Sequence, residues 1–156
     1  MNYAARNGCL DIVKWLHSNL SEGCSTIAMD RAARRGHLDV VKWLHEHRNE
    51  GCTTNAMDRA AENGHLEVVV WLHENRSEGC TKFVMGCAAR NGHLHVVKWL
   101  HKNRSEGSAM NNAAAAGSLA IVQFLHYNRS EGCTSRAIML AVIHKHFDVF
   151  AFLHAN

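Results

Sequence analysis

The sequence contains no proline, although it is 156 residues long. Proline is the strongest breaker of helix interiors, so its absence favours a helical chain. No apolar run approaches the length that spans a membrane, and the first residues, MNYAARNG, lack the apolar core of a signal peptide. We therefore expect a protein that stays inside the cell, in the cytoplasm or the nucleus, and is not secreted.

The sequence also lacks a dominant charge. Its 17 basic and 14 acidic side chains are interleaved and give a formal net charge of +3. This balance is too mild to indicate a nucleic-acid or membrane surface by itself. The 47% hydrophobic and 20% charged residues are typical of a soluble globular chain.

What the sequence does contain is a repeated unit. The segment 52–79, CTTNAMDRAAENGHLEVVVWLHENRSEG, follows a similar segment at 24–51 and precedes another at 80–107. The central glycines Gly8, Gly36, Gly64 and Gly92 are each 28 residues apart. Such a period indicates stacked repeats that cover one another's apolar faces. We divide a single domain, 1–156, into repeats at 1–23 (truncated), 24–51, 52–79, 80–107, 108–132 and 133–156.

Each repeat is predicted to be a pair of antiparallel helices. In repeat 52–79, Thr53 or Thr54 can cap a first helix that runs from about Asn55 to Asn63. Gly64 then ends this helix, because glycine accepts the left-handed conformation of a helix stop. A second helix begins near His65 and is expected to stop at Gly79.

Cysteines recur in one slot of the repeat, and this argues against disulfides. Stacked helices lie roughly 8–10 Å apart, whereas a disulfide needs Cα atoms within about 7 Å. We therefore expect free thiols that pack as small apolar residues in a reducing compartment. The residues of this slot are Cys24, Cys52, Cys80 and Cys133.

The segments AAENGHLEVVVWL at 60–72 and AARNGHLHVVKWL at 88–100 resemble ankyrin repeats in the alanine pair, the glycine–histidine turn and the two valines. The resemblance implies an all-α solenoid of stacked helix–turn–helix repeats and a non-enzymatic protein–protein interaction scaffold. The usual ankyrin repeat has about 33 residues. The residues missing here correspond to the β-hairpin finger, so we expect short loops in place of β-hairpins.

The first helices carry a face that varies between repeats, whereas the apolar slots hardly change. A constant scaffold with a variable wall is what a recognition surface needs, and arginine and aromatic side chains are common anchors. The alternative is neutral drift of solvated positions. The residues predicted to contact a protein partner are Arg31, Arg34, Asn55, Asp58, Arg59, Glu62, Phe83 and Arg90.

One slot of the second helices is always aromatic. We expect these rings to form the structural core between layers, with indole nitrogens reaching polar atoms or water. The residues of this aromatic slot are Trp15, Trp43, Trp71, Trp99, Phe124 and Phe152.

A nucleic-acid-binding array is the main alternative function. Its basic stripe would be interrupted by Asp30, Asp58 and Glu62, and no row of stacking aromatic residues accompanies it. These features argue against nucleic acid as a partner. The stripe would consist of Arg6, Arg31, Arg34, Arg35, Arg59 and Arg90.

No catalytic, metal or cofactor site is predicted. The histidines recur once per repeat, too far apart for the roughly 2.0–2.3 Å ligand distances of one zinc ion. Cys87 and His93 share a repeat, but no third orienting group accompanies them.

The last repeat is more apolar than the others. Met139, Leu140 and Ile143 stand where polar residues stood in earlier repeats. Terminal repeats usually need a polar outer face. Three explanations compete: a segment of a longer array, self-association through this repeat, or an apolar binding spot.

Overall fold

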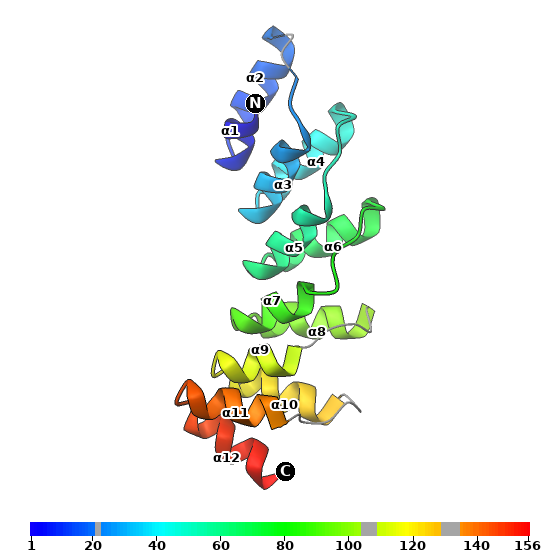
Figure 1. Ribbon diagram of the computed structural model, residues 1–156. Coiled ribbons are helices and arrows are strands. Elements are labelled where there is room, and N and C mark those ends of the chain that lie inside the picture. Colours follow the sequence, from blue (N-terminus) through cyan, green and yellow to red (C-terminus); the bar gives the residue numbers. More distant parts are fainter. Residues whose placement is uncertain (21–22, 104–108, 129–134) are drawn as a thin grey trace. The chain divides into compact units, whose positions relative to one another are not determined.

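The computed structural model describes residues 1–20, 23–103, 109–128 and 135–156. Within these residues the chain is helical and contains no strand, so the all-α repeat architecture is confirmed. The helices form two compact units, Met1–Thr81 and Lys82–Asn156 (Figure 1). The single domain 1–156 stays a prediction.

The first unit consists of three helix pairs. The first helices of the pairs, α1, α3 and α5, pack side by side, and α4 contacts both α2 and α6 (Figure 1). We call α1, α3 and α5 the inner helices of this unit and their solvent-exposed side the inner face. The pairs are α1 (Asn2–Arg6) with α2 (Leu10–Asn19), α3 (Thr26–Arg34) with α4 (Leu38–His47), and α5 (Thr54–Glu62) with α6 (Leu66–Asn75).

The second unit repeats this arrangement. Its inner helices α7, α9 and α11 pack in sequence, and α10 contacts both α8 and α12. The pairs are α7 (Val84–Arg90) with α8 (Leu94–Asn103), α9 (Ala109–Ala115) with α10 (Leu119–Asn128), and α11 (Ser135–Ile143) with α12 (Phe147–Ala155).

The turn inside each pair follows the predicted chemistry. The hydroxyl of Thr53 accepts a hydrogen bond from the amide of Asn55 at 3.1 Å and begins α5. Gly64 adopts φ 79° after α5, and the amide of His65 donates to the carbonyl of Ala60 at 2.9 Å. In the last repeat Lys145 occupies the glycine slot with φ 62°.

The second helix is shorter than predicted. Helix α6 ends at Asn75, and the expected stop at Gly79 is wrong. The side-chain amide of Asn75 donates to the carbonyl of Trp71 at 2.8 Å, which satisfies an end carbonyl before the glycine is reached. Arg76 then has extended backbone, φ −129° and ψ 148°, so the segment up to Gly79 is a loop.

The core between the helices consists of small and branched aliphatic residues. Ala60 and Ala61 of α5 and Val69 of α6 are 0% exposed, and Leu72 is 1% exposed. Alanines allow the inner helices to approach closely, and the valines and leucine fill the space behind them. The equivalent residues of the second unit, Ala88, Ala89, Val97 and Leu100, are equally buried.

The aromatic slot lies at the edge of this core, which corrects the prediction that its rings form the core. Trp15 is 59% exposed. The valines and leucine already occupy the space between layers, and the rings of Trp43 and Trp71 contact a histidine of the preceding repeat at the edge of that space. The other members of the slot, Trp43, Trp71, Trp99, Phe124 and Phe152, are half-buried.

Histidine–aromatic contacts recur from repeat to repeat. The ring of His17 meets Trp43 edge-on, with centroids 5.2 Å apart and an interplanar angle of 81°. His45 meets Trp71 at 5.2 Å and 82°. In the second unit His126 meets Phe152 at 5.4 Å and 84°. Edge-to-face geometry at these distances stabilises ring pairs, so the histidines of the second helices pack against the next repeat.

The cysteines are thiols in the part of the chain that the structure describes. Cys52 is 7% exposed, and burial raises the pKa of its thiol to about 12. Such a thiol stays protonated and packs as a small apolar side chain, as predicted. Cys133 lies outside the described residues.

Candidate partner-binding face

The predicted partner-binding residues fall into two groups, one in each unit. Arg31 and Arg34 lie on α3, and Asn55, Asp58, Arg59 and Glu62 lie on the adjacent helix α5. The structure therefore brings these six residues to the inner face of the first unit. Phe83, the N-cap of α7, and Arg90, its last residue, belong to the second unit.

Most of these side chains are open to solvent. Arg31, Arg34, Asn55, Arg59 and Arg90 are exposed, whereas Asp58 and Glu62 are half-buried. Phe83 is 62% exposed, and the ammonium of Lys82 lies 5.3 Å from the centre of its ring. An exposed ring beside a cation is a suitable anchor for a partner.

Asp30 and Asp58 have a structural role that the sequence analysis missed. The carboxylate of Asp30 accepts hydrogen bonds from the amide and the hydroxyl of Thr53, both at 2.8 Å. Asp58 accepts from the amide of Thr81 at 2.9 Å. Each aspartate thus holds the loop that leads into the next inner helix.

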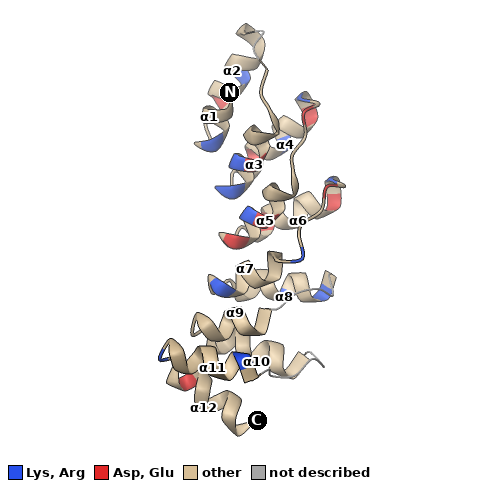
Figure 2. Ribbon diagram, in the orientation of Figure 1, with Lys and Arg blue, Asp and Glu red and all other residues tan. Residues whose placement is uncertain are grey.

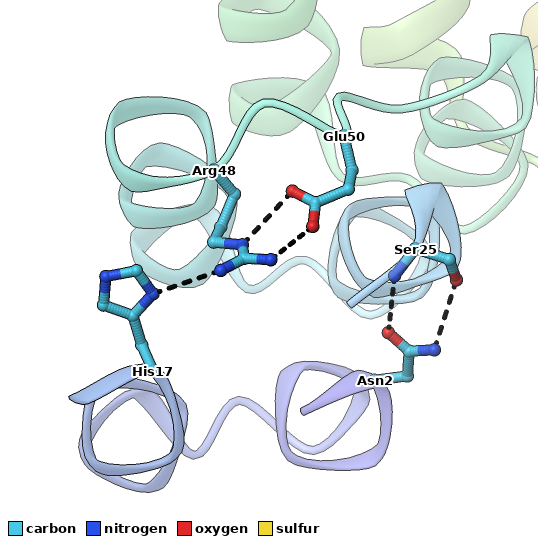
Figure 3. Close-up of polar contacts among 5 residues, drawn as sticks. All are labelled: Asn2, His17, Ser25, Arg48 and Glu50. Carbon is cyan, nitrogen blue, oxygen red and sulfur yellow. Dashed lines mark hydrogen bonds and ion pairs between the residues drawn. The ribbon is translucent and has the colours of Figure 1, made fainter. Parts of the chain in front are cut away.

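The first repeat makes the same link with different residues. The side chain of Asn2 donates to the hydroxyl of Ser25 at 3.2 Å and accepts from its amide at 3.3 Å (Figure 3). The signal in the sequence was a polar acceptor followed 23 residues later by a hydroxyl residue. An alignment that compares the repeats one position at a time does not show this pairing.

A second contact with the same geometry in two repeats links the second helices of neighbouring pairs in the first unit. The guanidinium of Arg48 binds the carboxylate of Glu50 with two hydrogen bonds, one of them 3.2 Å long, and donates to Nδ1 of His17 at 3.4 Å (Figure 3). Arg76, Glu78 and His45 repeat this arrangement one repeat later. The loop after α4 is thereby attached to α2, and the loop after α6 to α4.

The Arg76–Glu78 pair predicts an acid-sensitive part of stability. Hydrogen bonds from Arg76 lower the pKa of Glu78 from 4.5 to about 2. A carboxyl with a lowered folded-state pKa stabilises the fold above its unfolded pKa. That contribution is lost as the pH falls from about 4.5 towards 2.

We expect Glu78→Gln to be less stable than the parent near neutral pH and to lose less stability on acidification. Urea unfolding at neutral pH and at about pH 3, within the window set by the two pKa values, measures this difference. Glu74→Gln, at an exposed position of α6, is the control. An identical pH slope for Glu78→Gln and the parent would contradict the prediction.

The charge of the inner face changes from basic at α3 to mixed at α5. On α5, a nitrogen of Arg59 lies 2.6 Å from a carboxylate oxygen of Glu62, an ion pair between successive turns. In Figure 2 the ribbon is red, for an acidic residue, at the end of α5, and blue, for basic residues, at the ends of α1 and α3. Glu62 occupies the repeat slot that holds Arg6 and Arg34 in the two preceding repeats.

A hollow of about 190 Å³ lies at the basic end of this face. It is lined by Arg6, Arg31, Arg34 and Arg35. Arg31 and Arg34 were predicted partner-binding residues, whereas Arg6 and Arg35 entered only through the basic stripe. The sequence signal for the cluster was the run RAARR at 31–35 beside an arginine one repeat earlier.

The family model for ankyrin repeats, in three copies, matches residues 1–85. The chain belongs to the ankyrin-repeat family. Ankyrin repeats are generally protein–protein interaction modules, and the family is typically a non-enzymatic scaffold. No curated protein matches the chain significantly.

The described part of this ankyrin-repeat chain holds neither a candidate metal site nor a membrane-spanning helix. Among the described residues, no group of three or more histidine, cysteine, aspartate or glutamate side chains is placed to hold a metal ion. None of the described helices is long and apolar enough to cross a membrane. The absence of a cofactor and of catalysis stays a prediction.

Proposed function

We propose that this ankyrin-repeat chain is a non-enzymatic scaffold that binds a protein partner on the exposed inner face of its first unit. The observation that supports this most directly is the division within each inner helix. Ala56, Met57 and Ala60 of α5 are buried against neighbouring helices, while Asn55 and Arg59 are exposed. Packing therefore restricts one side and leaves the other available for recognition.

The residues of the proposed surface have different tasks. Arg31 and Arg34 offer guanidinium groups, and arginine is enriched among the residues that dominate binding energy. Glu62 orients Arg59 through their ion pair. Asp58 preserves the shape of the surface by holding Thr81. In the second unit, Phe83 and Arg90 supply a separate exposed contact area.

A photo-crosslinking experiment tests the binding face. A photoreactive amino acid replaces Asn55 on the inner face or Lys42 on the exposed side of α4, and each variant is irradiated in extracts of the native cell. We expect protein adducts from position 55 that are absent from position 42. Equal adduct patterns from both positions would show that the inner face is not the recognition surface.

The same proposal includes an intracellular location. The family assignment supports this location, because ankyrin-repeat proteins are often intracellular. Fluorescence microscopy of the tagged chain in its native cell measures the location directly.

We also propose self-association through the last repeat. Four large apolar side chains of α11 and α12 are exposed: Met139 at 52%, Val142 at 47%, Ile143 at 60% and Phe147 at 67%. Burying apolar surface of this kind favours association by about 25 cal/mol per Å². Light scattering coupled to size exclusion is expected to give a mass above the monomer, which Ile143→Ser with Phe147→Ser reduces. A monomer at high concentration would contradict this.

A further inference from the structure

The arginine hollow of the first unit has no internal counter-charge. Arg6 is the last residue of α1, Arg31 and Arg34 lie in the last turn of α3, and Arg35 is its C-cap. All four are exposed. Within the described residues, none of them forms an ion pair or a side-chain hydrogen bond with an acidic group.

We propose that this hollow binds a short acidic segment of the protein partner, with aspartate or glutamate carboxylates on the four guanidinium groups. This inference rests on the proposed protein-binding function and names the chemistry that the partner presents. Guanidinium is a planar donor fork that matches a carboxylate with two parallel hydrogen bonds. Four such forks around one hollow provide more donors than a single carboxylate can accept.

Helix ends do not cancel this positive charge. The C-terminus of a helix carries the equivalent of about half a negative charge. Helices α1 and α3 together therefore offset about one of the four positive charges, and about three remain. An acidic segment would relieve the repulsion among the arginines, which no described carboxylate relieves.

The extent of the basic surface favours a protein segment over a nucleic acid. The cluster occupies the ends of two neighbouring inner helices, and at the third helix, α5, Glu62 stands in the arginine slot and pairs with Arg59. A nucleic acid presents a continuous row of phosphates and needs a positive groove that follows it. A short acidic segment needs only the two repeats that are basic.

Fluorescence anisotropy with the full chain tests the proposal. The probes are a short labelled peptide of alternating glutamate and serine, the same peptide with glutamine for glutamate, and a labelled single-stranded oligonucleotide. We expect the glutamate peptide to bind and the glutamine peptide not to bind. The double variant Arg31→Gln with Arg34→Gln is expected to weaken binding about tenfold, since exposed ion pairs contribute up to about fivefold each.

The matched control removes the same charge elsewhere. Lys102 and Arg136 are exposed residues of the second unit, and their replacement by glutamine is expected to leave peptide affinity unchanged. Circular dichroism verifies that both double variants keep the helical fold. If both double variants weakened peptide binding equally, the effect would come from net charge alone, and the proposed site would be refuted.

The remaining outcomes separate this site from the proposed function. If the oligonucleotide binds more tightly than the glutamate peptide and depends on Arg31 and Arg34, the ligand class is wrong. If no peptide binds while position 55 still crosslinks to a protein, the acidic segment is refuted and the scaffold function stands. If the peptide binds but position 55 gives no adduct, the scaffold function fails on its own test.

Discussion

Replacing Gly36 with alanine is expected to lower the free energy of unfolding by about 3 kcal/mol. Gly36 has φ 78°, a left-handed conformation that costs other residues roughly 1–2 kcal/mol. A Cβ at this position would also lie 2.6 Å from Nδ1 and 2.9 Å from Cε1 of His65, the N-cap residue of α6 in the next repeat. Overpacking of this kind costs about 1–3 kcal/mol in addition.

A second glycine turn of the chain separates the cost of the left-handed backbone from the cost of overpacking. Gly92 has φ 77°, but the nearest atom to its Cβ position is the hydroxyl oxygen of Ser118 at 3.8 Å. We therefore expect Gly92→Ala to lower stability by only the conformational cost, about 1–2 kcal/mol. Urea unfolding followed by circular dichroism measures both variants, and equal losses would show that His65 yields without cost.

The last turn provides the reverse substitution. Lys145 adopts φ 62° in the slot that is glycine in the earlier repeats. Lys145→Gly should therefore raise stability by up to about 1 kcal/mol, because the left-handed strain is removed while the unfolded chain gains some freedom. Destabilisation of this variant would indicate that the lysine side chain makes a compensating contact.

Features that recur within one repeat were predictable from the sequence. The period, the helix pair, the threonine cap and the left-handed glycine each depend on neighbouring residues and fixed backbone preferences. The ends of α5 at Thr54 and Glu62 differ from the expected Asn55 and Asn63 by one residue each. The end of α6 was missed because Asn75 closes the helix with its own side chain.

Features that depend on contact between repeats were not predictable in the same way. Asn2, Asp30 and Asp58 look like one variable slot when repeats are aligned, yet each binds a residue 23 positions later. The Arg48–Glu50 pair with His17 is likewise distributed over two repeats. A helical wheel shows on which side of its own helix a residue lies, but the residues that it contacts on that side belong to another repeat.

The second large effect is expected at Leu72, whose replacement by alanine should lower the free energy of unfolding by about 3 kcal/mol. Leu72 is 1% exposed and lies on α6, which packs against the inner helix α5 of its own pair. Truncating a leucine at such a site removes apolar contacts and leaves a cavity that the packed alanines of α5 cannot fill.

The neighbouring aromatic slot provides the comparison that decides where the core lies. If the rings formed the core, as the sequence suggested, Trp15→Ala would cost about 3–5 kcal/mol. Because Trp15 is 59% exposed, we instead expect Trp15→Ala to lower the free energy of unfolding by less than about 1 kcal/mol. Trp71 is half-buried, so we expect Trp71→Ala to lower it by about 2 kcal/mol. Urea unfolding monitored by circular dichroism measures the three variants without relying on tryptophan fluorescence. We expect the largest loss of stability for Leu72→Ala, a smaller loss for Trp71→Ala and the smallest for Trp15→Ala. A Trp15 variant as unstable as the Leu72 variant would place the aromatic slot back in the core, because only a ring enclosed by neighbouring atoms could lose that much on truncation.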